Sequence, residues 1–165
     1  METKAKKYTK PEAVKMLEAM AFEVKRLKFP TIPITHLVKE SFRDDKANDL
    51  TKCVCKYIQL KGYQAERIST TGRPIDRRET FTNVLGQSRT IGSVQWVYGT
   101  VTPGSADISA TIHGRSVKIE IKIGKDYQSR AQKDYQKAIE SANGLYFICK
   151  DFTSFVEWYK NTFEL

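Results

Sequence analysis

Alternating apolar and polar positions mark two neighbouring segments in the second half of the chain. Apolar residues occupy every second position of 105–112 and again of 117–123, with charged or hydroxyl-bearing residues between them. A period of two is typical of a strand that buries one face. His113-Gly114 lies between the segments and suits a tight turn with a positive φ at its second position. The pattern therefore predicts a β-hairpin.

Helical spacing of apolar residues predicts helices on either side of this hairpin. The expected helices are 9–28 with a capping box at Thr9 and Glu12, a short helix over 34–42, a helix from Asn48 to Gly62, a helix over 129–143 closed by Gly144, and a last helix capped by Asp151. Two more strands are expected at 63–69 and 145–149, the latter apolar throughout, as in a strand covered on both faces.

This order of elements predicts an α/β fold with a mixed central sheet flanked by helices. Residues 1–45 would form an N-terminal helical extension and residues 46–165 the main domain. Residues 71–95 interrupt the order, because glycines and prolines punctuate them and arginines such as Arg73 outnumber acids. We expect an inserted basic loop or hairpin in which 94–98 pairs as one strand. Such an insertion contacts a nucleic-acid backbone or is a solvated surface excursion, and the sequence leaves both open.

Charge narrows the class of partner. Lys and Arg number 28 against 19 Asp and Glu, and the net charge of +9 is spread over the chain. A distributed positive field favours nucleic acid over an acidic small molecule. Lys125, Arg130 and Lys133 lie around the 129–143 segment and are candidates for phosphate contacts, although an exposed charged helix face has the same appearance.

The sequence lacks the patterns expected of a cysteine-based metal site, a catalytic triad or a nucleotide-binding loop. The three cysteines lack a paired C-x-x-C spacing, which predicts buried thiols in a reducing cytoplasm. His36 and His113 are the only histidines, and His113 lies in the predicted turn, so a Ser-His-Asp or Cys-His catalytic set is not expected. No phosphate-binding glycine loop indicates a nucleotide cofactor. The apolar runs are too short to cross a bilayer, so we expect no membrane association.

The register of the hairpin brings two acids together. With a two-residue turn at His113-Gly114, Asp107 lies directly opposite Glu120. Facing β-carbons are about 4.5–5.5 Å apart, so the two carboxylates can share one cation, and all-oxygen ligation suits Mg²⁺ or Mn²⁺. Lys122, on the same face, can serve an attacking water or offset charge during phosphodiester hydrolysis. The alternative is a solvent-facing strand on which Glu and Lys form cross-strand pairs.

These residues resemble a known family. Gly104-Ser105-Ala106-Asp107-Ile108, followed by Glu120-Ile121-Lys122 and then Gln132, is similar to the motif of the PD-(D/E)XK nuclease superfamily, most closely its VRR-NUC type. The resemblance covers residues 46–150, with Ala106 where the motif has proline. It implies a restriction-endonuclease-like αβββαβ core in which Asp107, Glu120 and the Ile121 carbonyl hold the metal, Lys122 serves the attacking water and Gln132 supports the site.

The resemblance also implies an acidic residue on the helix before the first strand. Asp49 is the candidate, with Glu66 and Glu40 as weaker substitutes, although an acid in a first helical turn also simply complements the helix dipole. The expected function is that of a Mg²⁺-dependent DNA endonuclease. Its expected substrate is branched or structured DNA such as a Holliday junction or flap, cut by a homodimer. The alternative is a noncatalytic DNA-binding or decoy module on the same scaffold.

Overall fold

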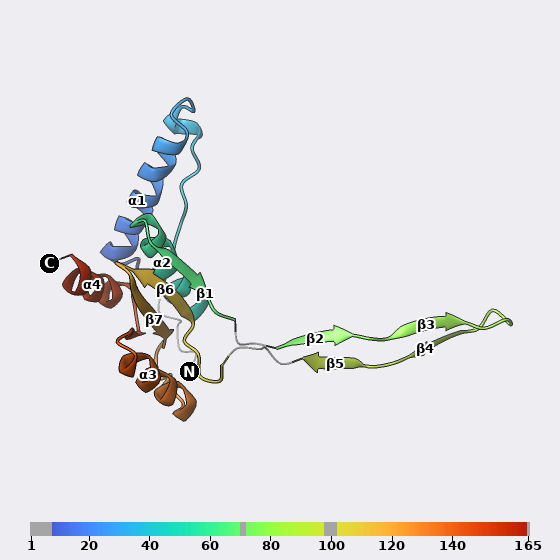
Figure 1. Ribbon diagram of the computed structural model, residues 1–165. Coiled ribbons are helices and arrows are strands. Elements are labelled where there is room, and N and C mark those ends of the chain that lie inside the picture. The colour runs from blue at the N-terminus through green and yellow to red at the C-terminus, as the bar shows by residue number, and fades with distance from the viewer. Residues whose placement is uncertain (1–7, 70–71, 98–101, 165) are drawn as a thin grey trace, which may run out of the picture.

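A four-stranded mixed sheet lies at the centre of the molecule (Figure 1). The computed structural model describes residues 8–69, 72–97 and 102–164. The sheet contains β1 (Gln64–Arg67), β6 (Ile108–Ile112), β7 (Arg115–Ile121) and β8 (Leu145–Cys149), side by side in that order. β6 is antiparallel to both of its neighbours, whereas β8 is parallel to β7. The coarse α/β prediction with a mixed sheet is therefore confirmed.

Helices cover both faces of the sheet. They are α1 (Glu12–Lys28), α2 (Ala47–Leu60), α3 (Arg130–Ser141) and α4 (Phe152–Phe163). Side chains of α1, α2 and α4 form one core with the apolar face of β6 and β7, where Ile108, Val117 and Ile119 are fully buried. Glu120 points to the opposite face, and Gln132 of α3 donates a hydrogen bond to it. The α3 helix therefore lies across the polar face.

The ends of the helices follow local rules with two exceptions. Asp151 caps α4 by accepting a hydrogen bond from the Ser154 amide, and Gly62 follows α2 with a φ of +86°, both as expected. The capping box expected at Thr9 was wrong, because the N-cap of α1 is Pro11 and no side chain bonds to it. The left-handed residue after α3 is Asn143, with a φ of +59°, rather than Gly144.

The short helix expected over 34–42 was also wrong. Only a single 3-10 turn forms there, η1 (Ile34–His36). Pro33 begins this turn, and beyond it most of the side chains up to Ser41 are exposed, with Leu37 the buried exception. A helix needs a continuous apolar face to stay packed, and this segment has one buried residue to offer.

The central hairpin has the predicted turn and register. His113 and Gly114 both have positive φ, at +49° and +75°, as a two-residue hairpin turn of this kind requires. Ile108 pairs with Ile119, so the predicted alignment is confirmed. The strands are shorter than expected on the outer side, which leaves Asp107 one residue before β6 and Lys122 one residue after β7.

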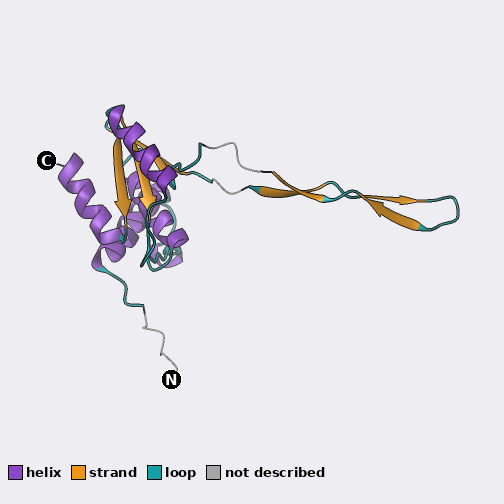
Figure 2. Cartoon of the chain, turned by 90° about the horizontal axis from the view of Figure 1, so that it is seen from below, coloured by secondary structure: helices purple, strands orange, loops and turns teal. Residues whose placement is uncertain are grey.

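Residues 72–97 form a long two-stranded arm that extends away from the sheet and helices in both views (Figures 1 and 2). One part pairs β2 (Arg73–Asp76) with β5 (Val94–Val97), and the outer part pairs β3 (Glu79–Thr82) with β4 (Ser88–Ile91). The expected inserted hairpin is therefore confirmed, including the strand from Val94. The predicted extension of that strand to Tyr98 lies outside the described residues.

The last strand is less buried than its composition suggested. β8 is an edge strand, and its residues from Leu145 to Ile148 are half-buried, while Cys149 is fully buried. Its alternate side chains point to the two covered faces of the sheet: Phe147 stacks on Trp158 of α4, and Tyr146 faces the polar side with Glu120. Both faces of β8 are therefore covered, as expected, and the strand is only half-buried because the described residues place no further strand beside its outer edge.

The three cysteines carry free thiols that are largely shielded from solvent. Cys53 and Cys149 are buried, Cys55 is half-buried, and all three are free. Burial raises the pKa of the Cys53 thiol to about 12 and that of Cys55 to about 11.

Within the residues that the structure describes, none of the helices combines the length and the apolar character needed to cross a membrane.

Candidate active site

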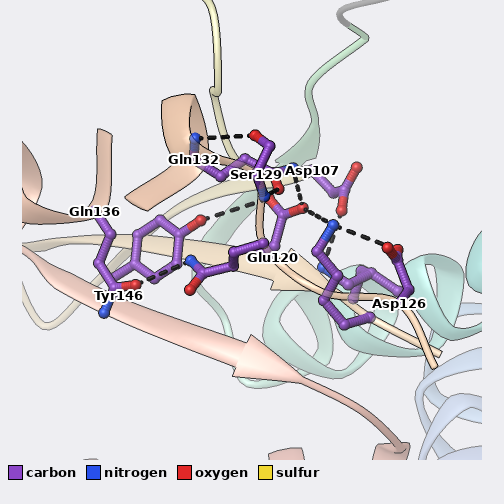
Figure 3. Close-up of polar contacts among 10 residues, drawn as sticks. Asp107, Glu120, Asp126, Ser129, Gln132, Gln136 and Tyr146 are labelled. Atoms are coloured by element: carbon purple, nitrogen blue, oxygen red, sulfur yellow. Dashed lines mark hydrogen bonds and ion pairs between the residues drawn. The ribbon is translucent and has the colours of Figure 1, made fainter. Parts of the chain in front are cut away.

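The candidate site lies on the polar face of the sheet, where β7 ends beside the start of β6. Ile108 pairs with Ile119, so Asp107 and Glu120 occupy the next facing position. The Ile121 amide donates a 2.9 Å hydrogen bond to Asp107 Oδ2, which holds this carboxylate against β7 (Figure 3). The Asp107 carbonyl in turn accepts a 2.7 Å hydrogen bond from the Ile68 amide beyond β1. Backbone pairing on both sides therefore positions Asp107.

Glu120 is at the centre of a hydrogen-bonded cluster (Figure 3). Its Oε1 accepts from Gln132 Nε2 at 2.5 Å and lies 3.1 Å from the Lys122 amine. Its Oε2 accepts from the Tyr146 hydroxyl at 3.5 Å. The side chains of Glu120 and Lys122 are 2% and 8% exposed. This burial excludes the alternative of a solvent-facing strand with surface ion pairs, and the Glu120–Gln132 contact brings together residues that the sequence predicted to act as a set.

Gln132 reaches the site because of how α3 begins. Ser129 accepts from the Gln132 amide, and Gln132 Oε1 accepts from the Ser129 amide, which is a complete capping box. The same side chain uses its Nε2 to hold Glu120. One glutamine therefore fixes both the start of the helix and the orientation of a buried carboxylate.

Burial and like charge shape the electrostatics of the cluster. The pKa of Glu120 is raised, first by burial and then by the neighbouring Asp107 carboxylate, against the lowering effect of Lys122. For Lys122, burial lowers the pKa, but the bonds to Glu120 and Asp126 outweigh it and the net shift is upward. Burial and the Glu120 charge raise the pKa of Tyr146. Lys122 is thus held as a cation beside two carboxylates.

Glu120→Gln is expected to raise Tm in the absence of divalent cations, and to do so more at pH 8 than at pH 4.5. A carboxyl whose pKa is raised by folding destabilises the native state as pH rises from its ordinary value of 4.5 through the raised one. The glutamine removes this charge but still accepts hydrogen bonds. Thermal denaturation of both proteins in EDTA across this pH range measures the difference in Tm between the variant and the parent protein. A difference in Tm that grows as the pH falls would contradict the upward shift assigned to the Glu120 pKa.

A hollow of about 190 Å³ opens beside Lys122. Its lining includes Lys133, which the sequence singled out, and Lys150, which it did not. The Lys122 amide donates to the Cys149 carbonyl at 2.9 Å, so the parallel pairing of β7 and β8 continues and sets Lys122 next to Lys150. The signal in the sequence was that a lysine directly follows each of two strands, Lys122 after β7 and Lys150 after β8. Lys125 and Arg130 are exposed and do not line this hollow.

The sequence also missed Asp126 and Tyr146. Asp126 lies 3.3 Å from the Lys122 amine, four residues further along the chain. Tyr146 reaches Glu120 from the neighbouring strand, because Lys118 pairs with Tyr146 and Glu120 shares that face. Asp126 stands in a loop, where no periodicity signals a contact. Tyr146 becomes visible only once β8 is known to lie beside β7.

The structure does not bring Asp49 into this cluster. Its carboxylate pairs with Lys52 at 3.2 Å, and Glu40 pairs with Lys56 at 3.0 Å. Glu66 is exposed on β1 opposite Ser109, which places it on the same sheet face as the site. In the residues with described positions, no three His, Cys, Asp or Glu side chains gather to hold a metal ion. The available donors are two carboxylates and the Ile121 carbonyl.

Comparison with known proteins does not assign this chain to a family. No protein-family model matches the sequence, and no curated protein matches it either. What the site does chemically therefore rests on its own residues.

Proposed function

We propose that the protein is a Mg²⁺-dependent nuclease that hydrolyses phosphodiester bonds in DNA. The observation that carries the proposal is the set formed by Asp107, Glu120 and Lys122: two carboxylates on facing positions of one sheet face, with an amine 3.1 Å from the second. A pair of like charges, of which Glu120 is buried and Asp107 half-buried, is unfavourable by itself and is relieved by a cation. Such an arrangement next to a basic hollow suits phosphodiester chemistry better than a structural role.

The donor set fits Mg²⁺ or Mn²⁺. Asp107, Glu120 and the Ile121 carbonyl would hold the ion, and all three supply oxygen, which hard divalent cations prefer. Mg²⁺ keeps several waters and is commonly held by one or two carboxylates, so a third acid is not required. When bound, the ion would supply Lewis acidity to the scissile phosphate. Burial first and then the Asp107 carboxylate raise the pKa of Glu120, and the contribution of Asp107 reflects the charge that the cation would neutralise.

The chain's own residues supply the remaining chemistry. The raised pKa of Lys122 keeps its amine protonated at neutral pH, so it acts as a hydrogen-bond donor that orients the attacking water and offsets charge on the transition state. Gln132 keeps Glu120 in one orientation. Lys133 and Lys150 line the adjacent hollow, where they would bind the phosphate beside the one that is cut.

The fold and the charge support the same function. With the arm of β2 to β5 set aside, the elements after α2 run strand, hairpin, helix and strand, an order that supports the αβββαβ core implied by the PD-(D/E)XK resemblance. The net charge of +9 favours a polyanion. We propose branched or otherwise structured DNA, such as a Holliday junction or flap, as the substrate and a homodimer as the active form.

A noncatalytic DNA-binding module is the second candidate. It is favoured by the engagement of Glu120 Oε1 by both Lys122 and Gln132, and because the described residues hold no third acid that joins Asp107 and Glu120 as a metal ligand. Such a module would bind DNA in a salt-dependent way without cutting it.

One assay separates the two candidates. The protein is incubated with labelled junction, flap, single-stranded, plain duplex and RNA substrates in Mg²⁺, Mn²⁺, Ca²⁺ or EDTA. Cleavage in Mg²⁺ or Mn²⁺ that EDTA abolishes supports the nuclease. Salt-dependent binding with no cleavage in any divalent metal overturns it in favour of the binding module.

A further inference from the structure

The arm of residues 72–97 has two unlike faces. Its inner and outer parts share one continuous register, in which Arg73 pairs with Val97 and, eight residues on, Phe81 pairs with Arg89. Paired residues share a face and alternate residues change face. One face, here the basic face, therefore carries Arg73, Arg77 and Arg89. The other carries Arg78 and a series of threonine and serine hydroxyls from Thr80 to Ser88.

The charge of the arm is concentrated on the basic face. Arg78, on the hydroxyl face, forms an ion pair with Asp76 at 2.6 Å, so that face is neutral. Arg73, Arg77 and Arg89 form no ion pair with any residue whose position the structure describes, and all three are exposed. Glu79 is the single acid on their face. Three arginines against one acid leave a net charge of +2 in this row.

Exposed apolar side chains lie on both faces of the arm, with Val94 and Trp96 on the hydroxyl face and others beside the arginines. Phe81 is 53% exposed and Ile91 is 57% exposed on the basic face. An isolated two-stranded ribbon is marginally stable in water, so a ribbon with exposed apolar residues indicates a partner. A second copy docked on the same face would oppose two basic rows and repel. A polyanion matches the row in charge, and aromatic and aliphatic side chains can pack on sugars and bases beside phosphate contacts.

The dimensions of the arm suit a DNA groove. From Gly72 to the start of the turn at Asn83 there are 11 residue steps (83 − 72), or about 36 Å at ~3.3 Å per residue. This is close to one helical turn of B-DNA, about 34–36 Å. A two-stranded ribbon also fits within the major groove, which is about 12 Å wide.

We propose that the basic face of the arm lies along duplex DNA, with Arg73, Arg77 and Arg89 on backbone phosphates. The substrate class is then DNA that carries a duplex flank of about one helical turn beside the point of cleavage. The inference rests on the proposed function, because it takes DNA as the substrate of the candidate active site. It adds that the arm, rather than the site alone, selects DNA with an extended duplex segment.

The test uses the Arg73→Ala/Arg77→Ala/Arg89→Ala variant in EDTA, so that binding is measured without chemistry. Fluorescence anisotropy with 12- and 30-base-pair duplexes gives Kd over a range of salt concentrations. The variant is expected to bind the longer duplex at least tenfold more weakly. Its plot of log Kd against log salt should be shallower by about three, or roughly one for each lost phosphate contact. The preference for the longer duplex should also shrink.

A charge-matched control replaces Lys15, Lys28 and Lys160, exposed lysines of α1 and α4, with alanine. Both variants have a net charge of +6 (9 − 3), so the comparison keeps overall charge equal and changes the surface from which it is removed. Binding by the lysine variant should stay within about twofold of the parent protein. An equal loss in both variants would show that overall charge alone is responsible and would overturn the proposal.

The remaining outcomes separate this inference from the proposed function. Weaker binding by the arginine variant, together with no cleavage by the parent protein, would leave the arm assigned and remove the nuclease. Unchanged DNA binding overturns the assignment of the arm. If light scattering then shows a smaller assembly for the arginine variant, the arm joins two copies of the chain instead.

Discussion

Replacing Asp107 with asparagine, or Lys122 with methionine, is expected to lower metal-dependent DNA cleavage at least ~1000-fold without unfolding the protein. Asparagine keeps the oxygen that accepts from the Ile121 amide but removes a negative charge from the metal-binding pair. Methionine keeps the apolar stem of a side chain that is 8% exposed but removes the amine beside Glu120. Single-turnover cleavage rates with saturating Mg²⁺ measure the loss, and circular dichroism checks the fold.

Matched controls for these two variants lie close by. Lys118→Met changes the same kind of residue on the same face of β7, where Lys118 donates to Ser109 and, among the described residues, forms no hydrogen bond or ion pair with Glu120. Asp134→Asn removes one exposed carboxylate from α3. Both controls should keep cleavage within a few-fold of the parent protein. Undiminished cleavage by Asp107→Asn and Lys122→Met would remove these residues from the proposed site.

Gly104→Ala is expected to damage the site from a distance. Gly104 has a φ of +81°, and a β-carbon there would lie 2.3 Å from the Ala131 carbonyl oxygen and 2.8 Å from the Gln132 amide nitrogen. The loop that leads to Asp107 and the first turn of α3 must then separate. We expect a loss of about 1–3 kcal/mol in the free energy of unfolding. We also expect a loss of about 100-fold in cleavage, because small displacements of catalytic groups are costly.

Gly62→Ala is the control that isolates backbone strain. Gly62 also has a positive φ, +86°, but a β-carbon there meets nothing within 4 Å. Thermal denaturation and cleavage by the two alanine variants therefore separate strain from steric contact. If Gly104→Ala lowers neither Tm nor the cleavage rate more than Gly62→Ala does, the contact between this loop and α3 contributes to neither stability nor activity.

The candidate site contains residues that the sequence pattern predicts and residues that it does not. Asp107, Glu120 and Lys122 follow from the alternation of one hairpin and the length of its turn, and Gln132 entered through the resemblance. The sequence did not reveal Lys150 beside Lys122 or Tyr146 beside Glu120, because both positions depend on β8 pairing in parallel with β7 across an intervening helix. Asp49 was proposed from its place in a helix. The structure keeps it paired with Lys52 outside the cluster.

Trp96 shows that a strand can be predicted correctly while the burial of its side chains is not. Aromatic residues at regular spacing commonly belong to a core, and in α4 Trp158 packs against the core while Tyr159 is buried in it. Trp96 is instead 53% exposed on the hydroxyl face of the arm. The alternation of 72–97 correctly predicts strands, but alternation reports only that a chain is extended. It does not report whether another layer covers either face.

The sequence by itself determined the features that depend on neighbouring residues: the turn at His113-Gly114, the hairpin register, the capping of α4 by Asp151 and the facing pair of acids. These follow from backbone dihedral preferences and side-chain alternation, which act over a few residues. Only the tertiary structure decided that α3 covers the charged face, that Glu120 is 2% exposed and that Lys150 stands beside Lys122. Such contacts join segments far apart in the chain, and the free energy that selects them comes from burial, which no local pattern records.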